Sequence, residues 1–477
     1  MLFNSLGFAV FLPLVFAGYW LLCKKDLRLQ NFLLLAASYF FYACWDWRFL
    51  FLLMFSTLLD YVTGIRMHES ASERCRKVWF WASIAINLGF LGVFKYYNFF
   101  AGSMAELLSG FGVSANIASL QVILPVGISF YTFHGLSYVI DIYKKRIEPE
   151  RDPVTYSLFV SYFPLLVAGP IERATHLLPQ IKRRRTFDFD KARDGMFQIL
   201  WGLFKKVVIA DSCARYANAI FDSPDAVNSG TLILGAVYFA FQIYGDFSGY
   251  SDIALGTSKL FGIDLLRNFS YPYFSRDIAE FWRRWHISLS TWFRDYLYIP
   301  LGGSKGGMWM KVRNTFIIFL VSGFWHGANW TFIVWGALNA LYFMPLLLMG
   351  RNRANIDTVA QGSLLPSFRD LWAMATTFAL TTFAWIFFRA DSVGAAWHYI
   401  RGIFGMDFSG IDYLSCDRNA PELLPLLAIF IVAEWFSRHH EHPVFGKFQT
   451  AKAFAITAGI VLLGSFSDLN EFIYFQF

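Results

Sequence analysis

Residues 78–98 read VWFWASIAINLGFLGVFKYYN, a run of 21 residues in which Lys95 is the one charged side chain. A helix of about 20 apolar residues is long enough to cross the hydrocarbon core of a bilayer. Runs of this kind return along the whole chain. Together they predict an all-α polytopic membrane protein.

Thirteen apolar runs can be traced, near residues 2–22, 30–44, 49–64, 78–98, 118–142, 153–169, 194–211, 229–245, 312–325, 330–349, 368–388, 421–437 and 452–466. Several are interrupted, for example by Pro164 and by Lys205-Lys206, and such segments are expected to be re-entrant or buried inside the protein. We therefore expect about eleven spans. No repeat or linker divides them, so residues 1–477 are predicted as a single membrane domain.

The charge pattern supports membrane residence and orients the chain. Charged residues make up 16% of the sequence, whereas about a quarter of a soluble domain is charged. The net charge of +7 comes from short basic clusters between apolar runs and not from one patch that would bind nucleic acid. Because cytoplasmic loops are enriched in Lys and Arg, we expect residues 24–25, 66–77 and 144–151 in the cytoplasm and the N-terminus outside.

Several motifs of well-known enzyme classes are absent from the sequence, which argues against hydrolases and ATP-driven pumps. It has no Walker A motif, no GxSxG nucleophile elbow, no HExxH and no GxGxxG after a strand. Its five cysteines are scattered without a CxxC pair, which argues against disulfides and zinc. The first apolar run has no basic segment before it and is predicted to be a retained span rather than a signal peptide.

One histidine stands out among nine because of its apolar surroundings. His326 lies in SGFWHGANW, residues 322–330, between two strongly apolar stretches. An ionisable group at membrane depth is costly and usually faces a cavity. It is either a helix-packing histidine bonded to a carbonyl or a neutral imidazole that acts as a general base. By contrast, His439, His440 and His442 are expected in a polar segment that flanks the membrane.

A second constellation, FWRRWHISLSTWFRDYLYIPLGG, covers residues 281–303. Aromatic and cationic side chains alternate at helical spacing, which predicts an amphipathic helix at the membrane interface. Arg283, Arg284 and Arg294 either snorkel toward lipid headgroups or hold a phosphorylated ligand. His286 lies among apolar residues and is expected to turn inward, toward His326.

Two further polar patches lie in apolar sequence. In residues 245–252, GDFSGYSD, glycines surround two carboxylates, which predicts a broken helix that lines a cavity. Residues 168–173, AGPIER, are expected to form a turn at a membrane edge. Neither patch indicates a reaction.

These segments, with residues 124–134 (LPVGISFYTFH), 244–252 and 472–477 (FIYFQF), resemble the membrane-bound O-acyltransferase superfamily. The resemblance covers essentially the whole chain and is greatest to its bacterial alginate O-acetyltransferase branch. It rests on the combination of FWRRWHxSLS, RDYLYIPLGG and GxWHGxxW. It implies a helical fold with re-entrant segments around a central tunnel.

The resemblance also implies the chemistry. His326 would be the catalytic histidine and His286 the second polar catalytic position. Apart from the resemblance, we expect Arg283, Arg284, Arg294 and Trp325 to bind the donor. Acetyl-CoA would enter from the cytoplasm as a substrate, with no other cofactor and no metal. The acetyl group would leave on the periplasmic side of a bacterial inner membrane, for a partner of the SGNH type that modifies an exported polysaccharide such as alginate.

One departure and three alternatives remain. Some relatives have a further histidine after the WHG motif, where this chain has Asn339, which cannot titrate. The acceptor could instead be peptidoglycan, cellulose or a capsule. The donor could be D-alanine on a carrier protein, for transfer to teichoic acid. A protein of another class, a non-enzymatic transporter, would bind its substrate and move it without cleaving a thioester.

Overall fold

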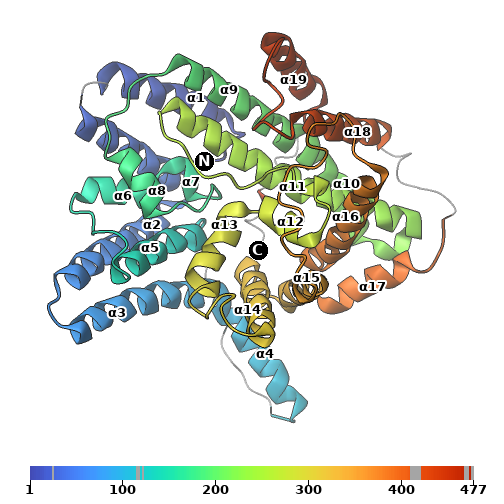
Figure 1. The fold of residues 1–477 in the computed structure, drawn as a ribbon, viewed down its shortest axis with the longest axis horizontal. Coiled ribbons are helices and arrows are strands. Elements are labelled where there is room, and N and C mark those ends of the chain that lie inside the picture. Colours follow the sequence, from blue (N-terminus) through green and yellow to red (C-terminus); the bar gives the residue numbers. More distant parts are fainter. Residues whose placement is uncertain (24–25, 114–118, 121–122, 409–419, 467–471, 474–477) are drawn as a thin grey trace. The chain divides into compact units, whose positions relative to one another are not determined.

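The structure, a computed structural model, describes residues 1–477 except 24–25, 114–118, 121–122, 409–419, 467–471 and 474–477. The described residues form helices and no strands (Figure 1). This confirms the predicted all-α class. The end of the 472–477 motif and the start of the 118–142 run lie outside the described residues.

Contacts divide the chain into two units, which we describe separately. The first contains residues 1–193 and 257–266, and the second contains residues 194–256 and 267–477. Two helices, α9 (Phe189–Leu203) and α11 (Ser229–Leu260), have residues in both units. The single domain predicted over residues 1–477 stays a prediction.

The first unit is built around the long helix α2 (Leu27–Glu69), which packs against α3 (Glu73–Leu91), α5 (Ile128–Tyr143) and α6 (Pro153–Ser161). Its other helical segments are α1 (Leu6–Ala17), η1 (Gly18–Leu22), η2 (Gly92–Tyr96), α4 (Tyr97–Gly110), α7 (Phe163–Leu166) and α8 (Ala174–Ile181).

Helix α2 joins two of the predicted runs, 30–44 and 49–64, across a kink. Asp46 leaves helical geometry, with φ −153° and ψ 111°. Its carboxylate accepts a hydrogen bond of 2.9 Å from the backbone N–H of Arg48. A side chain that caps the next turn satisfies N–H groups left without an intrahelical partner. Asp46 thus ends the first run and begins the second.

The second unit has a core of aromatic side chains, among them Trp285, Trp335 and Tyr244. Its helical segments after α9 are η3 (Phe204–Ala210), α10 (Asp211–Asp222), η4 (Pro224–Ala226), α11, η5 (Pro272–Phe274), α12 (Ile278–Arg284), α13 (Ile287–Phe293), η6 (Arg294–Tyr298), α14 (Met308–His326), α15 (Trp330–Leu348), α16 (Phe368–Arg389), α17 (Val393–Ile403), α18 (Ala420–Ser437) and α19 (Gln449–Leu463).

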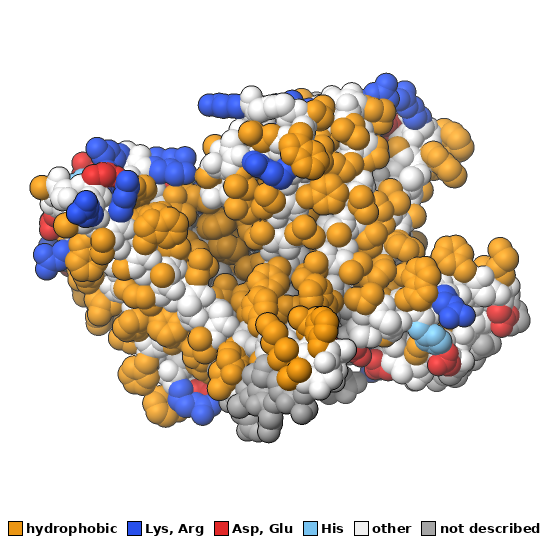
Figure 2. Space-filling model, turned by 90° about the horizontal axis from the view of Figure 1, so that it is seen from below, with side chains coloured by type: hydrophobic (Ala, Val, Ile, Leu, Met, Phe, Trp, Pro, Cys, Tyr) orange, Lys and Arg blue, Asp and Glu red, His pale blue; other side chains and the backbone are white. Residues whose placement is uncertain are grey.

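Seven apolar segments of the described chain fit a membrane. Four are long enough to cross one: Leu27–Glu69, Glu73–Gly110, Trp330–Leu348 and Phe368–Arg389. Three are shorter: Leu6–Leu22, Leu423–Ser437 and Gln449–Leu463. Large hydrophobic side chains on them are exposed, and Figure 2 shows broad hydrophobic areas with Lys and Arg gathered mostly at their borders. The chain is a helical membrane protein; the count of eleven spans stays a prediction.

The broken helix predicted at residues 245–252 is wrong, because α11 runs through it without interruption. Its glycines serve close packing instead. A Cβ on Gly249 would lie 2.7 Å from the carbonyl oxygen of Gly202, and one on Gly245 would lie 3.0 Å from that of Lys205. Small residues four apart let helix backbones approach in membranes. The glycines of α11 therefore allow α9 and η3 to lie against it.

This close approach pairs charges that looked isolated in the sequence. Lys205 Nζ lies 2.5 Å from Asp252 Oδ2, and Lys206 Nζ lies 2.9 Å from both Asp211 and Asp246. All five side chains are almost completely buried. Buried charges persist only where they are paired, so the lysines that interrupt the 194–211 run exist as partners for the carboxylates of α11.

Replacing one partner of such a pair should destabilise the protein strongly. Lys205→Ala leaves the Asp252 carboxylate buried without its ammonium, a change that costs about 3–5 kcal/mol. Arg151→Ala is the matched control, because its pair with Glu69 is 3.1 Å long but largely exposed and contributes at most about 1 kcal/mol. We expect thermal unfolding in detergent to begin well below the wild-type temperature for Lys205→Ala only. Equal midpoints for the two variants would contradict the role given to the buried pair.

Candidate active site

Helices α14 and α15 form a hairpin that places His326 at its tip. Helix α14 ends at His326, and the Asn329 side chain begins α15 by accepting a hydrogen bond of 3.1 Å from the Thr331 N–H. The two helices touch through backbone: a Cβ on Gly323 would overlap the carbonyl of Phe332, and one on Gly336 would overlap that of Phe319. The glycines of this region thus fix where His326 lies.

One hydrogen bond sets the tautomer of His326. Its Nδ1 lies 2.6 Å from the carbonyl oxygen of Ser322. A carbonyl oxygen can only accept, so Nδ1 carries the proton, and in a neutral imidazole the basic lone pair is then on Nε2. The ring is 4% exposed and contacts the rings of Trp335 and Phe388, with centroids 5.0 and 5.5 Å away. The structure thus confirms the carbonyl-bonded, packed histidine that the sequence raised as one alternative, and the role of the imidazole as a general base stays a prediction.

His286 enters the site through a break in its helix. Helix α12 ends at Arg284, His286 has left-handed backbone angles (φ 44°, ψ 54°), and α13 begins at Ile287. The predicted single amphipathic helix over residues 281–303 is therefore wrong. Trp285 causes the difference: it is 1% exposed and packs on Phe281 and Trp385, so it faces protein and not lipid. The turn beside it directs His286 inward.

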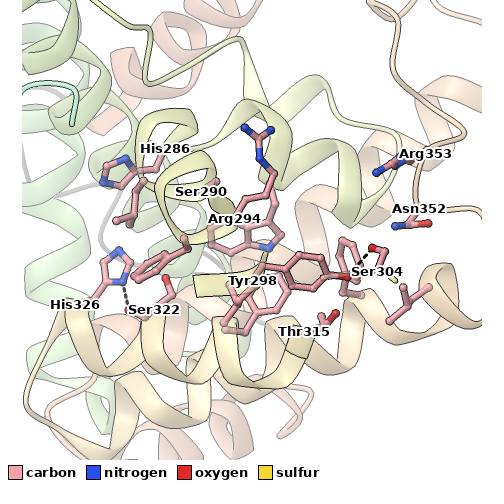
Figure 3. A pocket seen from close by; sticks show the side chains of 17 residues that line it. His286, Ser290, Arg294, Tyr298, Ser304, Thr315, Ser322, His326, Asn352 and Arg353 are labelled. Atoms are coloured by element: carbon pink, nitrogen blue, oxygen red, sulfur yellow. Dashed lines mark hydrogen bonds between the residues drawn. The ribbon is translucent and has the colours of Figure 1, made fainter. Parts of the chain in front are cut away.

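Both imidazoles line one cavity of about 240 Å³. Figure 3 shows His286 and His326 together at one end and Ser304, Asn352 and Arg353 at the other. The remaining lining residues are Trp282, Leu289, Ser290, Phe293, Arg294, Tyr298, Thr315, Ile318, Phe319, Ser322, Phe343 and Leu347. Most of the wall is aromatic or aliphatic, and a few hydroxyl groups lie between the two polar ends.

The residues predicted to bind the donor divide into two groups. Arg294 lines the cavity and pairs with Asp295 at 2.7 Å. Arg283 and Arg284 do not line it. Trp325 does not line it either, but its ring lies beside both imidazoles, with centroids 4.8 Å from His326 and 6.1 Å from His286.

Arg283 and Arg284 instead hold the loop that carries Arg353. Arg283 donates to the carbonyls of Asn352 and Asn355, at 2.8 and 2.6 Å. Arg284 donates to the carbonyl of Asp357 at 2.9 Å and pairs with Glu280 at 2.8 Å. The two guanidiniums thus hold the backbone of the loop whose residues Asn352 and Arg353 line the polar end of the cavity.

Sequence reasoning missed several lining residues. Ser290, Tyr298, Ser304, Asn352 and Arg353 are ordinary polar residues in the sequence. Arg353 is the third residue of the polar connection predicted as a loop at residues 351–367. Its one signal is its place shortly after the apolar run that ends at residue 349. Only the folded loop brings it to the cavity.

The other polar groups named from the sequence lie elsewhere. In the first unit Glu172 is buried and its carboxylate lies 2.8 Å from His176 Nδ1, so the AGPIER turn is buried in the protein, and its place at a membrane edge stays a prediction. In the second unit His442 bonds Asp194 at 2.9 Å. Asn339 donates to the carbonyl of Trp335 at 2.8 Å. No grouping suited to a metal ion occurs among the described residues.

The chain is similar to known proteins over most of its length. A model of the membrane-bound O-acyltransferase family matches residues 149–379. Probable alginate O-acetylases are 39% identical to the chain: that of Azotobacter vinelandii over 91% of this chain and 84% of its own length, and that of Pseudomonas aeruginosa over 85% and 75%. The peptidoglycan O-acetyltransferase of Helicobacter pylori is 34% identical over 89% and 83%.

The glycine contact in the hairpin can be tested by adding one carbon atom. By helix propensity alone, Gly323→Ala should stabilise α14 by up to about 1 kcal/mol. The clash with the Phe332 carbonyl should reverse the sign, since overpacking costs about 1–3 kcal/mol. Gly307→Ala is the control, because nothing lies near a Cβ at that residue. A thermal midpoint for Gly323→Ala at or above that of Gly307→Ala would contradict the backbone contact.

Proposed function

The chain belongs to the membrane-bound O-acyltransferase family, and from this premise we propose that it transfers acetyl groups from acetyl-CoA toward an exported polysaccharide. It is an O-acyltransferase of the membrane. The observation that carries the rest of the proposal is a cavity shared by two imidazoles at one end and an arginine at the other.

His326 supplies the base in this proposal. Its Nε2 takes the proton of the attacking hydroxyl, whose oxygen bonds to the thioester carbonyl carbon. The carbon–sulfur bond then breaks, and the sulfur leaves with the proton returned by His326, which yields the ester and free CoA thiol. Ser322 holds the ring throughout by accepting from Nδ1. A positioned base contributes about 10²–10⁴ in rate.

His286 orients the acceptor hydroxyl or polarises the thioester carbonyl. Burial holds the pKa of His286 well below its usual range, and the neighbouring His326 imidazole contributes a smaller effect in the same direction. At neutral pH it is therefore an uncharged hydrogen-bonding group. Alignment of both substrates in a mostly apolar cavity supplies the remaining acceleration, because the reaction becomes effectively unimolecular and water is excluded.

The donor lies along the cavity in this proposal, with its charged nucleotide toward Arg353 and Arg294. Arg353 is exposed and makes no ion pair within the described residues, which leaves its guanidinium available to phosphate oxygens. The apolar walls suit the pantetheine arm. Arg283 and Arg284, the phosphate partners expected from the sequence, act through the loop that they hold.

The proposal also covers orientation and partners. The cavity belongs to a tunnel among about eleven spans of a bacterial inner membrane, with a periplasmic N-terminus and a cytoplasmic donor entrance. A periplasmic SGNH-type partner receives the acetyl group for the polymer. Alginate is the acceptor we favour, since the relatives with 39% identity are probable alginate O-acetylases, and the relative from Helicobacter makes peptidoglycan the second choice.

Substitution of His326 tests the catalytic role. His326→Ala should lower acetyl transfer from acetyl-CoA at least about a hundred-fold, with expression and membrane insertion intact. His398→Ala is the matched control, since His398 is exposed and pairs with Asp225 at the surface. Cleavage of the thioester by purified protein is the readout, because a transporter would not cleave it. Wild-type cleavage by His326→Ala would refute the assignment. If the protein accepted only D-alanyl carrier protein as donor, the assignment of acetyl-CoA as the donor would be refuted.

A second experiment tests the donor end of the cavity. Arg353→Ala should raise the apparent KM for acetyl-CoA about ten-fold, the factor that 1.4 kcal/mol of lost charge-assisted hydrogen bonding gives. The KM for the acceptor and the thermal midpoint should stay near wild type. Arg351→Ala is the control, because this neighbouring arginine is exposed and does not line the cavity. An unchanged donor KM in Arg353→Ala would move the phosphate site elsewhere.

A further inference from the structure

The first unit has a polar cavity of its own, of about 440 Å³, which the proposed acetyl transfer does not use. It lies where α2, α3 and α5 supply His68, Arg76 and Ile142, and it is completed by the segment after α5. The full lining is His68, Arg76, Ile142, Lys145, Arg146, Ile147 and Glu148. Three of these seven side chains are cations and one is an anion.

The cations keep hydrogen-bonding capacity for a ligand. Arg76 donates to the carbonyl of Tyr143 and pairs with Glu73 at 3.4 Å, while Arg146 pairs with Asp141 at 2.9 Å. A guanidinium has five N–H donors, so each keeps some in reserve. Lys145 is exposed and has no ion pair in the described part of the chain.

The backbone at Lys145 adds a second observation. Helix α5 ends in a Schellman motif, in which Arg146 N–H bonds the carbonyl of Asp141 at 2.8 Å and Lys145 N–H bonds that of Ile142 at 2.9 Å. The residue between these bonds adopts left-handed geometry and is usually glycine. Lys145 occupies it with φ 57°. Glycine would adopt this conformation without strain, so a lysine at this position indicates a role for its side chain at the cavity.

Like charges crowd the same segment. Lys144 to Arg146 are three consecutive cations. Burial lowers the pKa of the neighbouring Lys144 ammonium, and the Arg146 guanidinium contributes a smaller effect in the same direction. A bound anion would relieve this repulsion.

An exposed apolar surface begins beside the cavity. Arg76 lies in the first turn of α3, and the helix continues as a candidate span. Val78 and Trp81, directly after it, are 61% and 63% exposed. A ligand that filled both places would have an anionic head and apolar chains.

We propose that this cavity binds the phosphate of an anionic phospholipid, with the acyl chains along the exposed face of α3. Basic pockets at the ends of membrane helices hold such headgroups elsewhere. Free inorganic phosphate has the same head chemistry without the chains, so the experiment separates the two sources. The basic character of residues 66–77 and 144–151 assigns the site to the cytoplasmic leaflet.

The test measures thermal unfolding of the whole purified protein in detergent, with dioleoyl phosphatidylglycerol, dioleoyl phosphatidylcholine or inorganic phosphate added. Phosphatidylglycerol should raise the wild-type midpoint more than phosphatidylcholine does, and phosphate should have no effect. An equal shift from the two lipids would overturn the proposal. The same shift from inorganic phosphate would overturn the lipid as ligand.

Lys145→Gly separates binding from folding. Glycine relieves the left-handed strain, so the variant should unfold at a higher temperature than wild type without lipid. It should nevertheless need about five-fold more phosphatidylglycerol for half of the shift, the loss expected for one cation at a membrane surface. Lys77→Ala, an exposed cation of α3 outside the cavity, should respond like wild type. An unchanged lipid response in Lys145→Gly would refute the site.

Discussion

A polar group without a partner costs several kcal/mol where lipid excludes water, and the second unit of this chain is arranged around that cost. Lys205 and Lys206 lie in apolar sequence because the carboxylates of α11 meet them at 2.5 and 2.9 Å. Close approach of α9, η3 and α11 makes those pairs possible, and the glycines of α11 make the approach possible. The same logic fixes His326, whose Nδ1–H bonds the carbonyl of Ser322.

The fold class could be predicted from the sequence, because a chain that resides in a membrane needs long apolar runs and few charged residues. The apolar runs predicted the all-α class, and the apolar sequence on both sides of His326 predicted a histidine that faces a cavity. Predictions from local sequence periodicity were wrong where contacts between distant segments determine the structure. Trp285 belongs to the aromatic face of an apparent helix, yet it is buried in the core, so the helix breaks at His286. Glycines suggested a break in α11 but mark a contact between helices.

Charge was harder to assign than burial. A cation in sequence can face a ligand, a lipid headgroup or another part of the protein, and its periodicity does not separate these. Arg283 and Arg284 bond backbone carbonyls of the 352–357 loop, and the phosphate contacts expected of them stay a prediction. Arg353, which that loop carries to the cavity, has no helical pattern to mark it. The position of a loop over a cavity depends on contacts far apart in the chain.

The central claim is that acetyl transfer takes place in the cavity that His286 and His326 share. The most direct measurement is a cryo-electron microscopy structure of the protein with a thioether analogue of acetyl-CoA, which cannot be cleaved. The account predicts the carbonyl of the analogue within hydrogen-bonding reach of the two imidazoles and its phosphates at Arg353. An analogue bound with its carbonyl outside this cavity, and both histidines remote from it, would contradict the account.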